Sequence, residues 1–165
     1  MYDPGLPRPQ LATLEPTQEQ KAMGKRRLSL MMAALFFLPG NACVYYGDEA
    51  GVTGMRDPYC RRTFPWGRED QTLTAHVQNV ARVRASEEPL RGGDVRFIDA
   101  GRDVLCFVRE KEGKKRIVLI NRAPVAQNVI LPLEDVVLTD VQSGEKVDAA
   151  NVCAPAQWWR VLRVE

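Results

Sequence analysis

The sequence predicts an α+β protein in two parts, and the residue pattern changes near Pro89–Gly93. Before this point lie two segments with helical features and one short apolar run between them. After it lie six short runs rich in β-branched and aromatic residues, separated by turn residues. We therefore expect residues 1–90 to form a helix–strand–helix unit and residues 91–165 to form a small antiparallel β-sandwich.

The first helix is predicted over Lys21–Leu38, after a stretch (1–16) whose four prolines indicate irregular chain. Thr17 and Gln20 have the spacing of a capping box, and a Pro-Gly pair ends the helix. From Leu28 onwards the helix is apolar on nearly every side. A helix of this kind is expected to be covered on more than one face.

A short apolar run, Ala42–Tyr46, predicts a strand buried on both faces, as in a parallel sheet. The long loop that follows, Asp48–Gln71, has a length typical of functional loops in compact domains. A second helix is predicted from Thr72 to about Ser86, with His76 on its solvated polar flank.

The second part is predicted to be all β. Glu112-Gly113 lies between two of its strands and indicates a tight hairpin. Trp158 and Trp159 are neighbours on one strand, so one should face the core and the other the surface. The predicted strands are Val95–Asp99, Val104–Glu110, Arg116–Asn121, Asn128–Leu131, Val136–Val141 and Trp158–Val164.

Composition argues against several partners. The 23 basic and 21 acidic residues nearly balance, and no basic run exceeds three residues, so nucleic acid is not expected as a partner. The longest apolar stretch, Leu30–Leu38, is much shorter than the about 20 residues that span a membrane.

The cysteines and the N-terminal residues bear on metal binding and on compartment. The cysteines are widely spaced and His76 is the sole histidine, so we expect neither a structural zinc site nor a cofactor. The first residues lack the basic start and apolar core of a secretion signal, which favours a cytoplasmic protein with reduced thiols. The cysteines are Cys43, Cys60, Cys106 and Cys153.

Three blocks of the sequence resemble family 13 of the glycoside hydrolases, the α-amylase superfamily, and especially its neopullulanase, cyclomaltodextrinase and maltogenic amylase branch. Leu38–Glu49 (LPGNACVYYGDE) is similar to the eighth strand of the family's (β/α)8 barrel. Asp57–Trp66 (DPYCRRTFPW) is similar to the loop after that strand, and Val83–Asp94 (VRASEEPLRGGD) to the last barrel helix. The resemblance implies that residues 1–90 are a C-terminal fragment of a TIM barrel and that residues 91–165 are the antiparallel domain C.

The resemblance also implies a substrate-binding loop. An Asp-Pro-x-x-Arg at this point lines the family's active cleft, so Asp57 and Arg61 are expected to hydrogen-bond a glucose unit at the donor side; alternatively they form a salt bridge that only shapes the loop. Tyr46, Asp48 and Glu49 would either support these contacts or cap the loop. Trp66 would stack on a sugar ring or lie in the core of the loop.

The family's catalytic residues have no counterpart in this sequence. Retaining glycosidases use two carboxyl groups about 5 Å apart, which the family takes from its fourth and fifth barrel strands, expected upstream of Met1. The His-Asp pair after the seventh strand is also missing, because His76 is the sole histidine. We therefore assign no catalytic residue and no metal ligand.

We expect this chain to be the C-terminal portion of a retaining α-glucan hydrolase that acts on α-1,4 bonds, with α-1,6 bonds as a further option, and to be inactive alone. The alternative is a non-catalytic module of the same family that binds glucans or another protein. An α-glucan oligosaccharide is the expected ligand of the intact enzyme. A barrel fragment with uncovered strand edges and apolar helix faces is also expected to self-associate.

Overall fold

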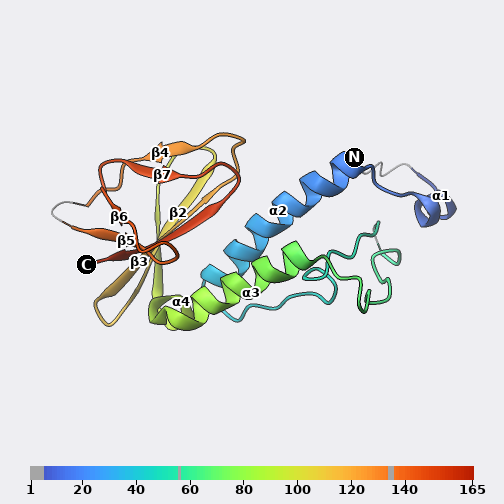
Figure 1. The fold of residues 1–165 in the computed structure, drawn as a ribbon, viewed down its shortest axis with the longest axis horizontal. Coiled ribbons are helices and arrows are strands. Elements are labelled where there is room, and N and C mark those ends of the chain that lie inside the picture. Colours follow the sequence, from blue (N-terminus) through green and yellow to red (C-terminus); the bar gives the residue numbers. More distant parts are fainter. Residues whose placement is uncertain (1–5, 56, 134–135) are drawn as a thin grey trace.

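The computed structural model describes residues 6–55, 57–133 and 136–165. Four helices precede eight strands along the described chain. Figure 1 shows the sheets at one end of the molecule, the long helices α2 and α3 side by side and extending away from them, and α1 at the far end. The elements are α1 (Arg8–Thr13), α2 (Gln18–Phe37), α3 (Gln71–Ser86), α4 (Glu88–Gly92), β1 (Asp94–Ile98), β2 (Val104–Lys111), β3 (Lys114–Asn121), β4 (Gln127–Val129), β5 (Leu138–Asp140), β6 (Lys146–Val147), β7 (Val152–Ala154) and β8 (Trp159–Val164).

Helix α2 begins at the predicted capping box. The backbone N–H of Gln20 donates to the Thr17 hydroxyl at 3.2 Å, and the Gln20 side chain accepts from the Thr17 N–H at 2.9 Å. The expected cover on several faces is not present among the described residues: Met32, Ala33 and Phe37 are buried, but Met31 is 66% exposed. One face of this apolar helix therefore packs inwards and another faces solvent.

The predicted strand Ala42–Tyr46 is wrong for this structure. The segment has no regular secondary structure, and the side chains of Tyr45 and Tyr46 are about half exposed. A strand is held by hydrogen bonds to its neighbours, and within the described part of the chain no strand lies beside this segment to supply them. The parallel pairing that this strand was expected to make is therefore absent from the described residues. The strand pairs β1–β2, β2–β3 and β3–β8 are antiparallel and lie in the C-terminal half.

Three smaller predictions also need correction. Residues 8–13 form helix α1, because proline is favourable in a first helical turn, where an N–H has no partner anyway. Helix α3 begins at Gln71, one residue before the predicted Thr72, because Asp70 caps it: the Asp70 carboxylate accepts from the Leu73 N–H at 3.2 Å. His76 is buried, not solvated, and bonds through Nε2 to the Ser29 carbonyl at 2.8 Å.

The C-terminal half contains the predicted all-β structure. Six strands form an antiparallel sheet in the order β1-β2-β3-β8-β5-β6, and β4 and β7 pair in a second, two-stranded sheet. The β2–β3 hairpin turns at Glu112-Gly113, and both residues have positive φ, as a type I′ turn requires. Strands β6 and β7 have only two and three residues, too short for their periodicity to stand out in the sequence.

Two apolar clusters lie on opposite faces of the large sheet. One joins it to the small sheet, through Cys106, Val108 and Leu119 against Val129 and Val152. The other joins it to the helices and includes a fully buried Trp159, whose ring meets Phe37 of α2 edge-on at 5.0 Å. Because the second cluster draws on α2, α3, α4 and the sheet, helices and strands share one core.

Buried charges reinforce the junction between helices and sheet. The Arg109 guanidinium, fully buried on β2, donates to the carbonyls of Phe37 at 2.6 Å and Gly93 at 2.7 Å. These carbonyls lie at the C-terminal ends of α2 and α4, where a positive charge is favourable. Glu87, only 1% exposed, accepts from Arg116 of β3 and, at 2.6 Å, from Arg163 of β8.

Candidate functional site

The loop between α2 and α3 holds all six predicted site residues, and long-range contacts fix its path. The Arg62 guanidinium donates through both terminal nitrogens to one carboxylate oxygen of Glu15, at 3.1 Å each. The same hydrogen bonds hold the pKa of Glu15 below its usual value. The Tyr46 hydroxyl donates to the Arg62 carbonyl at 3.0 Å. Arg62 therefore ties the middle of the loop both to the residues before α2 and to the start of the loop itself.

Asp48 and Glu49 lie at the base of the loop, in a compact turn. The Glu49 carboxylate accepts from the Gly47 N–H at 2.9 Å, and the Glu49 carbonyl accepts from the Thr74 hydroxyl at 3.0 Å. Burial, followed by repulsion from Glu49, raises the pKa of Asp48. Both residues are partly buried in this turn, and the contact of the Glu49 carboxylate with Gly47 matches loop capping, one of the two predicted roles.

Asp57 and Arg61 form an exposed ion pair on the outer part of the loop. The Arg61 Nε lies 2.7 Å from an Asp57 carboxylate oxygen, and both side chains are largely exposed. The chain can fold back here because residue 54 is glycine: a Cβ at Gly54 would lie 2.5 Å from the Tyr59 carbonyl oxygen. An ion pair this exposed contributes little to the stability of the fold. Its carboxylate and guanidinium groups are therefore available to bind a polar ligand.

Aromatic side chains accompany the ion pair. Trp66 is 81% exposed, which excludes the predicted alternative that it lies in the core of the loop. Its ring contacts Phe64, with 4.5 Å between centroids. Tyr45 and Tyr46 form a second exposed aromatic pair, at 4.9 Å. The described loop thus presents flat apolar surfaces together with one carboxylate–guanidinium pair, the mixture of groups that polar ligands with apolar faces require.

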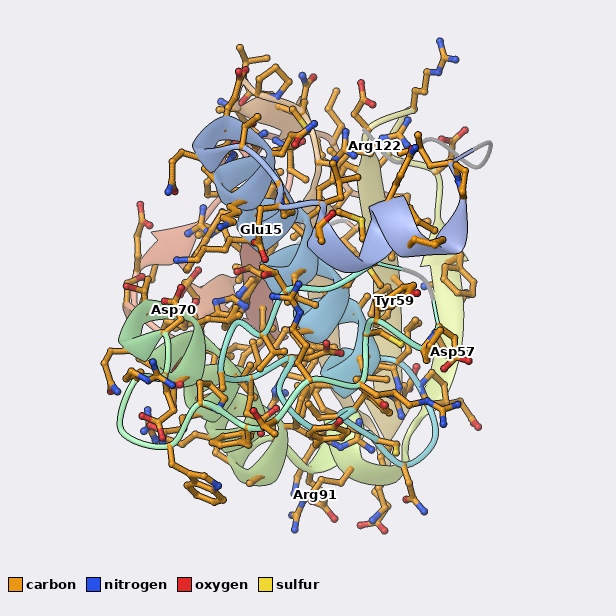
Figure 2. The ribbon with its side chains drawn as sticks, turned by 90° about the vertical axis from the view of Figure 1, so that its right-hand side faces the viewer. Glu15, Asp57, Tyr59, Asp70, Arg91 and Arg122 are labelled. Carbon is orange, nitrogen blue, oxygen red and sulfur yellow. The ribbon has the colours of Figure 1, made fainter. Side chains whose placement is uncertain are left out.

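The structure separates the six residues into two groups. Asp57, Arg61 and Trp66 lie exposed on the outer part of the loop. Asp48 and Glu49 are partly buried at its base, and the half-exposed Tyr46 donates to the loop backbone. Figure 2 shows Asp57 and Tyr59 on one flank of the molecule, Asp70 on the other, and Glu15 between them. Sequence reasoning missed the Glu15–Arg62 contact, because its partners are 47 residues apart and no local spacing connects them.

The described residues contain neither a metal-binding cluster nor a helix that could span a membrane. Across residues 6–55, 57–133 and 136–165, no three His, Cys, Asp or Glu side chains gather into a metal-binding group. None of the helices described for this chain has the length and apolar character needed to cross a membrane.

Comparison with known proteins places this fold in a family. No family model matches the chain. It is 33% identical over 153 residues to an amylopullulanase of Thermoanaerobacterium saccharolyticum, and 33% identical over 113 residues to a cyclomaltodextrinase of Geobacillus thermopakistaniensis. These alignments cover 83% and 66% of the chain. Its structure matches that of an Anoxybacillus α-amylase with a TM-score of 0.76 and 27% identity over 84% of the chain.

The chain belongs to the α-amylase family, glycoside hydrolase family 13. It corresponds to the C-terminal portion of these enzymes and spans 12% of the amylopullulanase, 19% of the cyclomaltodextrinase and 32% of the Anoxybacillus α-amylase. Two further solved structures share the fold at lower identity: a Geobacillus thermoleovorans α-amylase complexed with acarbose (22%, TM-score 0.76) and AmyP in complex with maltotriose (16%, TM-score 0.72).

Proposed function

We propose that this chain contributes one edge of the substrate cleft in a retaining α-glucan hydrolase of the neopullulanase and cyclomaltodextrinase type, acting on α-1,4 bonds and, as a further option, on α-1,6 bonds. Residues 1–90 would be the C-terminal part of its (β/α)8 barrel, with residues 91–165 as domain C. The observation that carries the proposal is the exposed Asp57–Arg61 pair, with 2.7 Å between Arg61 Nε and Asp57, in a chain of the α-amylase family.

The chemistry of the pair suits a sugar. A carboxylate accepts hydrogen bonds from two neighbouring hydroxyls, and a guanidinium donates to hydroxyl oxygens with a fixed planar fork. Trp66, exposed on the same loop, adds an apolar face of the kind on which a pyranose ring can rest. The Arg62–Glu15 contact holds the loop in place before any ligand arrives, which lowers the entropy cost of binding.

Binding of maltoheptaose to the chain, followed by isothermal titration calorimetry, tests the proposal. We expect Arg61→Ala to weaken binding by about tenfold, the loss that corresponds to one good charge-assisted contact. Arg122→Ala is the matched control, because Arg122 forms a similarly exposed pair with Asp103 at 2.9 Å on the β half of the chain. Equal binding by the two variants would refute the role of the Asp57–Arg61 pair.

Catalysis by the chain alone is tested separately, by release of reducing sugar from maltodextrin and cyclodextrin. We expect none, since the paired carboxylates of retaining enzymes have not been identified in this sequence. Hydrolysis that survives repurification and is lost in Asp57→Ala would overturn this part of the proposal. Sugar binding without hydrolysis would instead favour the alternative, a non-catalytic glucan-binding module.

Self-association and a cytoplasmic location complete the proposal. Met31, Leu35, Tyr45 and Tyr46 expose apolar or aromatic surface on the helical half, and such surface favours association. Light scattering on the purified chain is expected to show a mass above that of the monomer, which Met31→Asp reduces. A monomer at all concentrations would exclude this association.

One relative, from Bacillus subtilis, is named an intracellular maltogenic amylase, which supports the cytoplasmic assignment.

A further inference from the structure

We propose a second saccharide-binding site, in a groove where α2, α3 and the residue before β8 meet, with the indole of Trp158 as its platform. The groove has a volume of about 370 Å³. Three segments far apart in the sequence line it. They are α2 through Lys25 and Ser29, the N-cap and first half of α3, and Trp158; the residues from α3 and its cap are Asp70, Thr72, Leu73, Ala75, His76 and Asn79. None of the loop residues assigned above to the substrate cleft is among these lining residues.

Trp158 is held in one orientation without a ligand. Its ring stacks on that of Trp159 at 6.1 Å between centroids and 14° between planes, and Trp159 is itself fully buried. The His76 ring meets Trp158 edge-on at 5.4 Å, and its own position is fixed by the bond to the Ser29 carbonyl. A rigid aromatic surface loses little conformational entropy when a ring of a ligand packs against it.

The surroundings of the indole combine apolar and polar groups. Trp158 remains 41% exposed although its neighbour Trp159 is completely buried. Among the lining residues, the side chains of Ser29, Thr72 and Asn79 carry hydroxyl and amide groups that can donate and accept hydrogen bonds. Sites for small ligands typically pair an aromatic surface with a few polar groups of this kind.

The charges of the groove indicate a neutral ligand. Lys25 and Asp70 form an ion pair with each other, and the hydrogen bond from Lys25 holds the pKa of Asp70 below its usual value. Burial lowers the pKa of His76, so this ring adds no positive charge near neutral pH. A phosphate or carboxylate would find no unpaired cation among the lining residues, whereas a pyranose offers an apolar C–H face to the indole and hydroxyls to the amide and hydroxyl groups.

The ligand class, α-1,4-glucan, rests on the proposed function, but the site itself does not. The test therefore uses the Arg61→Ala chain, in which the cleft contact is already impaired, and maltoheptaose as the probe. We expect residual binding that falls at least about tenfold on adding Trp158→Ala, as truncation of an anchoring aromatic side chain does. Ile130→Ala is the control, since Ile130 is a highly exposed apolar residue that is not among those lining the groove.

A second variant guards against misfolding of Trp158→Ala. Ala75 lines the groove from the exposed side of α3, so Ala75→Arg fills the groove without touching the core. Loss of the residual binding in Ala75→Arg supports the site. The proposal is overturned if the Arg61→Ala chain binds no maltoheptaose, or if its binding survives both groove substitutions. Equal binding by wild type and Arg61→Ala would count against the cleft assignment alone.

Discussion

Replacing Glu87 by Gln is expected to weaken the junction between helices and sheet more than any conservative change on the surface. Glu87 is the N-cap of α4, and its carboxylate is 1% exposed. One oxygen accepts from Arg163 at 2.6 Å and the other from Arg116. Glutamine keeps the shape of the side chain but replaces one of these acceptors with an NH2 group that faces a guanidinium donor.

The magnitude follows from the burial of the three partners. Removing one member of a buried ion pair costs about 3–5 kcal/mol, because the remaining charge is left without compensation. Arg116 is nearly buried, but Arg163 is 44% exposed and can turn to water. We therefore expect the low end, about 3 kcal/mol of the free energy of unfolding. For a chain of this size the melting temperature would fall by about 6–12 °C.

Urea unfolding at pH 7, followed by tryptophan fluorescence and by circular dichroism, measures this loss. Glu88→Gln is the matched control, because Glu88 is the next residue and pairs with Lys111 at 3.3 Å and Lys114 at 2.9 Å in a more exposed setting. We expect Glu88→Gln to change stability little. A loss for Glu87→Gln no larger than that of Glu88→Gln would refute the argument that the buried carboxylate holds the junction together.

The same residue predicts a pH dependence. Burial by itself raises the pKa of Glu87, but the hydrogen bonds and charges of Arg163 and Arg116 outweigh it and hold the pKa below its usual value. A carboxyl group with a depressed folded-state pKa stabilises the protein above its unfolded pKa, about 4.3, and loses this contribution as the pH falls through the folded value. The stability difference between wild type and Glu87→Gln should therefore shrink below about pH 4. A constant difference down to pH 2 would contradict the ion-pair explanation.

Three further predictions concern single side chains. Arg109→Met should lower the free energy of unfolding by about 3 kcal/mol in urea titrations, since buried carbonyls lose a charged donor; a loss below 1 kcal/mol would be inconsistent with that burial. Burial raises the pKa of Cys106 to about 12, so native-state alkylation read by mass spectrometry should label exposed Cys43 and spare Cys106, and early labelling of Cys106 would contradict this. Glu112→Asn should stabilise the β2–β3 turn by about 0.5 kcal/mol, because asparagine accepts positive φ more readily before Gly113, and a lower thermal midpoint would count against it.

Local signals predicted much of the secondary structure correctly. The capping box at Thr17 and Gln20 lies where α2 begins, and Glu112-Gly113 forms the expected hairpin turn. The division of Trp158 and Trp159 between surface and core is also confirmed. These features depend on residues close together in the chain, so their spacing alone is informative. Ala42–Tyr46 shows the limit, because its composition favours a strand while strand formation depends on neighbours that the segment lacks in the described chain.

For the candidate site, the family resemblance directed attention to the loop and to Asp57, Arg61 and Trp66, while their role in binding stays a prediction. The structure adds that Asp57 and Arg61 form an ion pair and that Trp66 is exposed, two points on which the sequence left alternatives open. The sequence placed His76 on a solvated flank, and the structure buries it against Ser29. That difference arises because helical periodicity gives the faces of a helix but not the element that packs against each face.

By itself, the sequence determined the family, the change from helices to strands near residues 89–93, and the residue types available for binding a sugar. The tertiary structure alone decided how distant segments meet. It joins Arg62 to Glu15, gathers Arg116 and Arg163 around Glu87, and brings Trp158 to the groove between α2 and α3. Such contacts form because the chain must bury apolar surface and pair the charges that are buried with it. Local spacing carries no record of them, since the partners are separated by tens of residues.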